Sequence, residues 1–334
     1  MGRVIPLADL LATVRVVDLP LRRRFRGLER REAALLEGPA GWAEFSPFVE
    51  YDDREASRWL AAALDFGWTE PPAPLRTRIP VNATVPAVPA ADVADVLRLY
   101  PGCRTAKVKV AEAGQTLADD VARVAAVREL LGPEGRIRVD ANAAWNVDEA
   151  ERAVHAMAEF DLEYVEQPCA SLDELAELGR RIRYLAIPVA LDEAVRKSED
   201  PGEAARSGAG AVLIVKAAPL GGIRAALDLV SCAGLPTVVS SALETSVGLG
   251  MGAYLAAALP ELDFDCGLGT GSLLAEDVTG DPLVPAEGHI EVRRVVPDGA
   301  ALDRLAASSD RTAWWRDRLA RCHALLEESE ARSA

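Results

Sequence analysis

Five ionisable residues recur at nearly even spacing in the middle third of the chain, and each follows a short apolar run. They are Lys109, Asp140, Glu166, Asp192 and Lys216, separated by 31, 26, 26 and 24 residues. One β-strand, one loop and one helix fit an interval of this length. Repeated units of this kind close into a parallel barrel, which presents the carboxyl ends of its strands at one mouth. The spacing therefore predicts a barrel in which all five side chains meet at that mouth.

Composition limits the class of protein and of partner. The chain has 334 residues, half of them hydrophobic, which is enough for a barrel plus an additional segment. A net charge of −15 argues against nucleic acid or an anionic membrane as partner. The N-terminus has no long apolar signal region, and no run of 18 apolar residues occurs. We expect a cytoplasmic protein with reduced cysteines; its oligomeric state is open, and a monomer is compatible with the sequence.

The flanks of the chain differ from its middle. Residues 1–76 indicate strands followed by a helix, and the proline-rich EPPAPLRTRIP marks a boundary. The β/α rhythm occupies residues 77–285, where RIPVNATVP is the candidate first strand. The eighth strand, within LDFDCGLGTG, is short or replaced by a loop. Residues 286–334 return to mixed sequence and end in a helix. We predict an α/β, TIM-like barrel beside an α+β domain.

Three carboxylates are predicted to form a metal site. Asp140, Glu166 and Asp192 end the third, fourth and fifth strands, and adjacent strands lie about 4.8 Å apart. Three carboxylates this close need a counter-charge to stay ionised. The donors are all oxygens, with no histidine or cysteine at these strand ends, which favours Mg²⁺, or Mn²⁺, over Zn²⁺.

The lysines are predicted to perform acid–base chemistry. The second and sixth strands lie opposite each other in an eight-stranded ring, so Lys109 and Lys216 face each other across the mouth. Lys107 shares a strand face with Lys109 and should depress its pKa, as a lysine general base requires. Removing a proton next to a carboxylate gives an enediolate, and a divalent metal on the carboxylate oxygens stabilises that charge.

Each residue alone also has an ordinary structural interpretation. A charged residue at a strand end is more often solvated or ion-paired, and only the ordered set of five makes a functional site the better interpretation. Ser240 and Ser241 end the seventh strand and are candidates for substrate contact, although they could instead cap the next helix. Gly269 and Thr270 in GLGTG could contact ligand or belong to an ordinary loop.

Five segments in order carry a family resemblance. TAKVKV, RVDANAAW, YVEQP, ALDE and VKAAPLGG resemble the muconate-lactonizing branch of the enolase superfamily, over about residues 77–285. The resemblance implies a modified (β/α)8 barrel of the (β/α)7β type, at residues 77–285. It also implies an α+β capping domain, formed by residues 1–76 with 286–334 packing back on it, that covers the barrel mouth.

Within that branch, GWAEFSPFVEYDD and SSALETSVGLG are similar to o-succinylbenzoate synthases of the actinobacterial type. Those enzymes dehydrate 2-succinyl-6-hydroxy-2,4-cyclohexadiene-1-carboxylate in menaquinone biosynthesis. The resemblance implies that Lys109 removes the α-proton and then assists hydroxide departure on the same face. Lys216 would stabilise the enediolate, and the three carboxylates would bind Mg²⁺. N-acylamino acid racemases, dipeptide epimerases and cycloisomerases use the same residues and remain alternatives, as does, more remotely, a non-catalytic barrel that only binds a partner.

Overall fold

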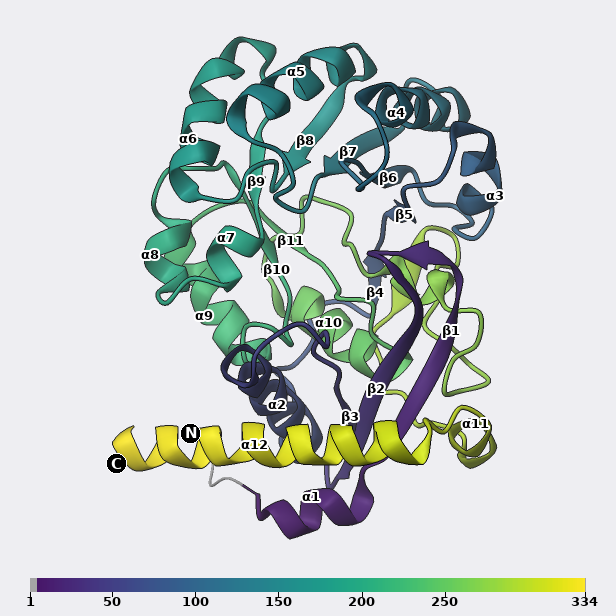
Figure 1. Cartoon of the computed structure of the whole chain (residues 1–334), viewed down its shortest axis with the longest axis vertical. Helices are drawn as coiled ribbons and strands as arrows, with labels where there is room; N and C mark the ends of the chain where they lie inside the picture. The colour runs from purple at the N-terminus through teal and green to yellow at the C-terminus, as the bar shows by residue number, and fades with distance from the viewer. Residues whose placement is uncertain (1–4, 334) are drawn as a thin grey trace.

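The computed structural model describes residues 5–333 and shows two parts, an antiparallel sheet with helices and a parallel barrel (Figure 1). The strands are β1 Arg15–Phe25, β2 Leu28–Gly38, β3 Gly41–Phe45, β4 Arg78–Pro80, β5 Ala83–Val85, β6 Thr105–Lys109, β7 Arg136–Asp140, β8 Leu162–Glu166, β9 Val189–Leu191, β10 Val212–Val215, β11 Thr237–Val239 and β12 His289–Glu291. The helices are α1 Leu7–Thr13, α2 Asp53–Trp68, α3 Val93–Leu97, α4 Leu117–Leu131, α5 Val147–Met157, α6 Leu172–Arg181, α7 Glu193–Arg196, α8 Pro201–Ala205, α9 Ile223–Ala233, α10 Ser246–Ala258, α11 Gly299–Arg304 and α12 Ser309–Ser333. Short 3₁₀ turns are η1 Ala90–Asp92, η2 Ala158–Phe160, η3 Arg183–Leu185 and η4 Gly269–Leu273.

The parallel sheet curls into a barrel that two residues close. Within the described residues its strand order is β11-β10-β9-β8-β7-β6-β5, and every pairing is parallel. Cys266 bridges Val81, and its N–H donates to the carbonyl of Pro80 at 2.8 Å. Gly267 bridges Ser240 and donates to Val239 at 2.8 Å. The predicted barrel is therefore confirmed, and its eighth strand is reduced to this pair.

The predicted first strand was wrong as a single element. RIPVNATVP divides into β4, which pairs antiparallel with β12, and β5, which joins the barrel beside β6. Pro80 has no N–H to donate to a ladder, and the chain changes partner directly after it. β12 thus lies beside β4, the strand that directly precedes the first barrel strand, β5.

Capping interactions fix where the barrel helices begin. In α5 the side chain of Asn146 accepts from the N–H of Glu149, which bonds back to the Asn146 N–H. Ser171 and Glu174 do the same for α6. Both arrangements are capping boxes, in which each side chain satisfies a backbone N–H at the helix start. Because each helix begins at a defined residue, each strand end before it holds a defined position at the mouth.

The barrel interior below the mouth is filled. Tyr164, Ala190, Val212, Ile214 and Val238 form a separate buried cluster inside the ring. The guanidinium of Arg138 is fully buried and lies 4.8 Å from the ring centroid of Tyr164, with an ion pair to Glu163 at 2.5 Å. This layer fills the barrel beneath the carboxyl ends of the strands.

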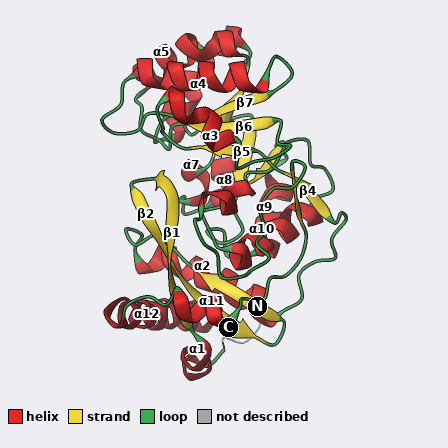
Figure 2. Ribbon diagram, turned by 90° about the vertical axis from the view of Figure 1, so that its right-hand side faces the viewer, coloured by secondary structure: helices red, strands yellow, loops and turns green. Residues whose placement is uncertain are grey.

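The α+β part packs against one side of the barrel and reaches over its mouth. β1, β2 and β3 form an antiparallel sheet, and the β1–β2 hairpin extends toward the barrel in both views (Figures 1 and 2). The turn at Arg26 and Gly27 has φ of +50° and +76°. The C-terminal helix α12 lies along α2 and β1, so the two ends of the chain share this domain. None of the described helices is long and apolar enough to cross a membrane.

One ion-paired carboxylate fixes α12 to the antiparallel sheet. The Glu32 carboxylate, on β2, accepts from Arg311 at 2.6 and 2.7 Å and from the indole N–H of Trp315 at 2.8 Å. Burial works against the charge, but the Arg311 and Trp315 hydrogen bonds prevail and lower the pKa of Glu32. Ionised Glu32 thus stabilises the folded chain.

We expect Glu32→Gln to lower the free energy of unfolding at pH 7 by about 1–2 kcal/mol, because charge-assisted hydrogen bonds are lost. The folded-state pKa is depressed, so this contribution is present above the ordinary value of 4.5 and is lost as the pH falls through the folded-state pKa. Urea unfolding from pH 7 down to pH 3 measures it. Glu37→Gln, an exposed change on the same strand, is the control. A difference that grows toward low pH would contradict the assignment.

Candidate active site

Lys107, Lys109 and Asp140 form the first part of the site. Lys109 and Asp140 end neighbouring strands and are direct partners in the β6–β7 register. The Lys109 ammonium donates to the Asp140 carboxylate at 2.5 Å and to the Asn142 side-chain oxygen at 2.7 Å. Lys107 lies 2.9 Å from the same carboxylate. Both lysines therefore point into the mouth, as strand alternation predicted.

Glu166 holds a carboxylate oxygen ready for a further ligand. It is the register partner of Asp140 at the end of β8, and its Oε1 accepts from Lys107 at 2.6 Å. Its Oε2 is buried and has no hydrogen-bond partner within residues 5–333. Burial, and then the charge of Asp140, raise the pKa of Glu166 to about 7. A buried carboxylate oxygen without a partner is costly, and this atom is free to accept from a further donor or to bind a cation.

Asp192 and Lys216 form the opposite part of the site. Asp192 lies just beyond β9, and its carboxylate accepts from Lys216 at 2.5 Å and from Arg196 at 2.9 Å. Asp192 is completely buried, and Lys216 is 7% exposed. Burial opposes the charge of Asp192, but Lys216 and Arg196 hold its pKa well below the usual range.

A chain of polar contacts connects the two lysines around the mouth. Asn142 bonds Lys109 and also donates to Glu193 at 3.3 Å; Arg196 donates to Glu193 at 3.0 Å and to Asp192. Asn142, Glu193 and Arg196 were not predicted as site residues. A signal for Arg196 exists in the sequence, because it follows Asp192 by four residues and opposite charges at that spacing meet on a helix. Asn142 has φ of +46°, which sequence does not reveal.

The electrostatics of the two β6 lysines differ. Burial lowers the tendency of Lys107 to carry charge, but Asp140 and Glu166 prevail and raise its pKa. For Lys109, burial and then the charge of Lys107 lower the pKa below the ordinary value of 10.5, against the pull of Asp140. The direction agrees with the expectation that Lys107 makes Lys109 the better base.

Of the four residues predicted to contact the substrate, three line one small cavity and the fourth does not. Ser240, Ser241 and Thr270 line the same small cavity as the three lysines. The Ser241 hydroxyl is 2.7 Å from both the Gly267 carbonyl oxygen and the Thr270 hydroxyl. Gly269 does not line this cavity. A Cβ there would lie 2.8 Å from the Asn82 carbonyl oxygen, so this glycine permits close packing of η4 on the barrel.

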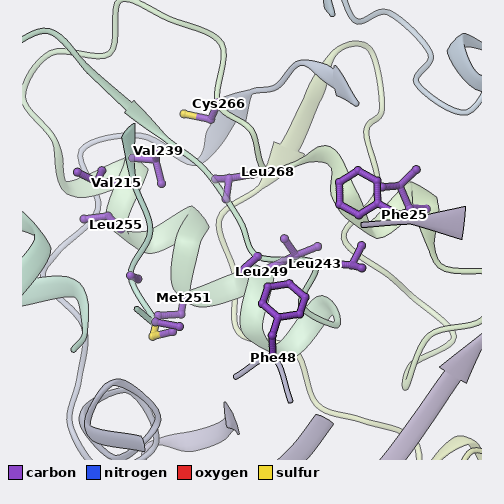
Figure 3. Packing of buried hydrophobic residues seen from close by; sticks show 14 of the residues in the cluster. Phe25, Phe48, Val215, Val239, Leu243, Leu249, Met251, Leu255, Cys266 and Leu268 are labelled. Atoms are coloured by element: carbon purple, nitrogen blue, oxygen red, sulfur yellow. The ribbon is translucent and has the colours of Figure 1, made fainter. Parts of the chain in front are cut away.

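Two adjoining cavities share Phe25, Arg26, Lys109 and Asn142. The inner one measures about 30 Å³ and contains Lys107 and Lys216. The outer one measures about 530 Å³ and opens between the β1–β2 turn and the loops after β6 and β7. Phe25, Phe48 and Leu243 supply the apolar wall of the inner cavity, and all three belong to the buried packing drawn in Figure 3. Small-molecule sites measure roughly 300–1,000 Å³, a range that the outer cavity meets.

The three carboxylates fit a hard divalent cation by donor type. Asp140, Glu166 and Asp192 are at most 1% exposed and supply only oxygen donors. Among the described residues no three acidic, histidine or cysteine side chains are arranged as a ready metal site. Lysine and arginine nitrogens contact four of the six carboxylate oxygens. Asp140 Oδ1 accepts from the Asn142 N–H at 2.9 Å, and Glu166 Oε2 has no partner among the described residues. A cation here would thus replace ammonium groups as the counter-charge.

Comparison with known proteins identifies the family. Residues 16–67 match the enolase N-terminal domain-like family and residues 90–300 the enolase C-terminal domain-like family. The o-succinylbenzoate synthase of Mycobacterium marinum is 54% identical over 321 residues, 96% of each chain. The chain belongs to the o-succinylbenzoate synthase family. The o-succinylbenzoate synthase of Mycobacterium tuberculosis is 53% identical to this family member, over 97% of this chain and 98% of the relative.

Solved structures support the architecture of this o-succinylbenzoate synthase family member. The muconate lactonizing enzyme of Pseudomonas fluorescens, complexed with muconolactone, superposes with a TM-score of 0.75 over 88% of this chain and 98% of that one. Its sequence is 21% identical, so the likeness concerns the fold alone. The predicted barrel with an α+β capping domain is confirmed.

Proposed function

We propose that this chain catalyses the Mg²⁺-dependent syn-dehydration of 2-succinyl-6-hydroxy-2,4-cyclohexadiene-1-carboxylate to o-succinylbenzoate, in menaquinone biosynthesis. The observation that carries the proposal is the pair of lysines, Lys109 and Lys216, lining one cavity above three buried carboxylates. The relatives named o-succinylbenzoate synthase support the choice of substrate. Enzymes of the enolase superfamily commonly pair a lysine base with Mg²⁺.

Lys109 is proposed as the base. Asp140, Glu166 and Asp192 would hold Mg²⁺, or Mn²⁺, which supplies positive charge to the substrate carboxylate when bound. Neutral Lys109 takes the proton from the carbon next to that carboxylate, and the C–H electron pair moves into the enediolate. The electrons then return to form the ring double bond as the C–O bond breaks. Lys109, now protonated, returns its proton to the departing hydroxide on the same face, and water leaves.

Lys216 is proposed to stabilise the enediolate from the opposite face without exchanging a proton. Its ammonium donates to the Asp192 carboxylate at 2.5 Å. A charged ammonium can stabilise a developing anion but cannot accept a proton. This assignment separates dehydration, which needs one lysine for proton transfer, from racemisation, which needs one on each face.

The succinyl arm is proposed to occupy the outer cavity. The inner cavity has room for about one or two waters, so a six-membered ring cannot enter it unless Phe25 and Arg26 at the hairpin turn shift outward. Arg26 places a guanidinium between both cavities, 4.4 Å from the Phe48 ring centroid. An arginine suits the second carboxylate of a dicarboxylate substrate.

Lys216→Arg tests the function. We expect the wild-type protein to dehydrate the cyclohexadiene, and Lys216→Arg to keep measurable dehydration, lowered about tenfold, because arginine retains the charge. Any racemisation of N-acylamino acids should be lost, since arginine does not exchange protons near neutral pH. Product formation is followed by absorbance and racemisation by polarimetry. No dehydration by the wild type would overturn the proposed function, and wild-type racemisation alone would favour a racemase.

A further inference from the structure

A buried polar cluster lies beside the active site and connects the antiparallel sheet with the barrel. We call it the sheet–barrel cluster; each member is at most 6% exposed. Its members are Arg31, Glu44, Ser46, Glu244 and Thr245. None of the five has a role in the proposed chemistry. Burying charged groups is costly, and burial followed by the charge of Glu244 raises the pKa of Glu44 to about 7.

Arg31 binds the backbone of the loop that follows β11. Its Nε donates to the Leu243 carbonyl at 3.1 Å, and its Nη2 donates to the Ala242 carbonyl at 3.4 Å and to the Ser46 carbonyl. The same guanidinium lies 4.5 Å from the ring centroid of Phe48. Ala242, Leu243 and Phe48 all line the inner cavity, whereas Arg31 does not. Arg31 therefore acts on the cavity wall from behind.

Glu44 binds the other end of the same loop. Its Oε2 accepts from the Thr245 N–H at 3.0 Å, from the Thr245 hydroxyl at 2.5 Å and from the Gly248 N–H at 3.2 Å, while Ser46 donates to Oε1 at 2.6 Å. Thr245 is the N-cap of α10 and Gly248 lies in its first turn, whereas Ser46 follows β3. A carboxylate from β3 thus caps a barrel helix, and a Cβ at Gly248 would lie 2.9 Å from it.

The loop between these anchors contains a backbone conformation that needs support. Leu243 has φ of +64°, in the region that L-residues rarely adopt, and its side chain is 1% exposed. The Glu244 carboxylate accepts from the Ala242 N–H at 2.7 Å across this turn. Such a conformation is strained and persists only where surrounding contacts hold it.

We propose that Arg31 and Glu44 are positioning residues, which hold Ala242 and Leu243 in the conformation that shapes the wall of the substrate cavity. The inference rests on the proposed function, because it assigns these residues to that reaction. Through these two residues, the antiparallel sheet determines the geometry of the barrel loop that contains Ala242 and Leu243. Leu243 then fixes the position of the bound ring relative to Lys109 and Lys216.

The test compares two arginines that bind carbonyls around the same helix. Arg31→Met removes the contacts to the cavity wall. Arg76→Met is the matched control, because Arg76 donates to the Ala256, Leu259 and Pro260 carbonyls at the far end of α10. We expect Arg31→Met to lower kcat/KM about tenfold or more, and Arg76→Met less than twofold at similar loss of thermal stability. Misplacement of a substrate by 1 Å can cost about 100-fold in rate. Equal kcat/KM for the two variants would overturn the proposal.

A double-mutant cycle separates positioning from general stability. Glycine adopts positive φ without cost, so the effect of Arg31→Met on kcat/KM should be at least threefold smaller in the Leu243→Gly background. An additive result would overturn the proposal. If Arg31→Met does not fold, Glu44→Ala and Glu44→Gln replace it. We expect at least a tenfold loss of kcat/KM for alanine and rescue to within threefold by glutamine, which keeps a carbonyl acceptor. Equal loss in both would overturn it.

Amide exchange distinguishes failure of this inference from failure of the proposed function. Arg31→Met, or Glu44→Ala in its place, should accelerate exchange in residues 240–245 of the full-length chain more than Arg76→Met does. Unchanged exchange there would overturn the positioning role even in an active enzyme. If the wild type does not turn over the cyclohexadiene, the proposed function fails, whereas the exchange comparison still decides whether Arg31 and Glu44 hold the loop.

Discussion

Lys109→Ala is expected to lower kcat for the dehydration by about 10³-fold or more, because the proposed proton acceptor at the end of β6 is lost. General-base catalysis contributes roughly 10²–10⁴-fold, and the same lysine is assigned the return of the proton to hydroxide. Steady-state turnover of the cyclohexadiene measures the loss. Affinity for o-succinylbenzoate should change far less than kcat, because the carboxylates and Lys216 remain.

Lys197→Ala is the matched control for this variant. Lys197 follows α7 and lies 4.7 Å from the Tyr51 ring centroid, and it lines neither cavity. Its replacement should leave kcat within about twofold. If Lys109→Ala kept more than a tenth of the wild-type kcat, another group would be the base and the assignment to Lys109 would fail.

Lysine usage in the chain gives independent support to these assignments. The sequence contains four lysines, at positions 107, 109, 197 and 216, against 33 arginines. Three of the four line the inner cavity, whereas arginines make the surface and interdomain ion pairs. Arginine carries a positive charge at any working pH, while a buried lysine can lose its proton. This difference matters for Lys109, the proposed base, because Lys107 and Lys216 are assigned no step that needs a neutral amine.

The period and alternation of the strands made much of the mouth predictable. Alternation places Lys107 and Lys109 on one face of β6, and the even spacing places Asp140 beside them. Both are local properties of the chain, so one sequence reveals them. The two-residue eighth strand and the divided first strand depend instead on pairing between Val81 and Cys266, far apart in sequence, and no local pattern encodes that choice.

The contacts from the antiparallel sheet were beyond prediction for the same reason. Arg31 and Leu243 are separated by 212 residues, and Glu44 and Thr245 by 201. In the sequence Arg31 is one member of a basic stretch that suits an exposed strand equally well. Arg26 likewise fits a solvated hairpin turn until the fold places it beside Phe48. Which charges become buried is decided by domain packing, not by residue type.

Glu166→Gln is expected to abolish the stabilisation of the protein by Mg²⁺. A cation that binds only the folded chain stabilises it by about 2.7 kcal/mol at 100 times its Kd. Glu166 has a buried carboxylate oxygen with no partner among the described residues, and glutamine offers one neutral oxygen in place of two charged ones. Thermal unfolding with and without Mg²⁺ measures the effect, and titration with Mn²⁺ followed by electron paramagnetic resonance measures binding directly.

Glu193→Gln decides whether this effect belongs to the proposed ligand or to any acidic residue nearby. Glu193 adjoins Asp192, and its Oε2 is also buried without a partner within residues 5–333. Its Oε1, however, accepts from Asn142 and Arg196, so its carboxylate is held in the contacts that surround the mouth. We expect Glu193→Gln to keep most of the Mg²⁺-dependent stabilisation and Glu166→Gln to keep none. The reverse pattern would move the metal from the ends of β7 and β8 toward α7, and a full Mg²⁺ effect in both variants would exclude Glu166 as a ligand.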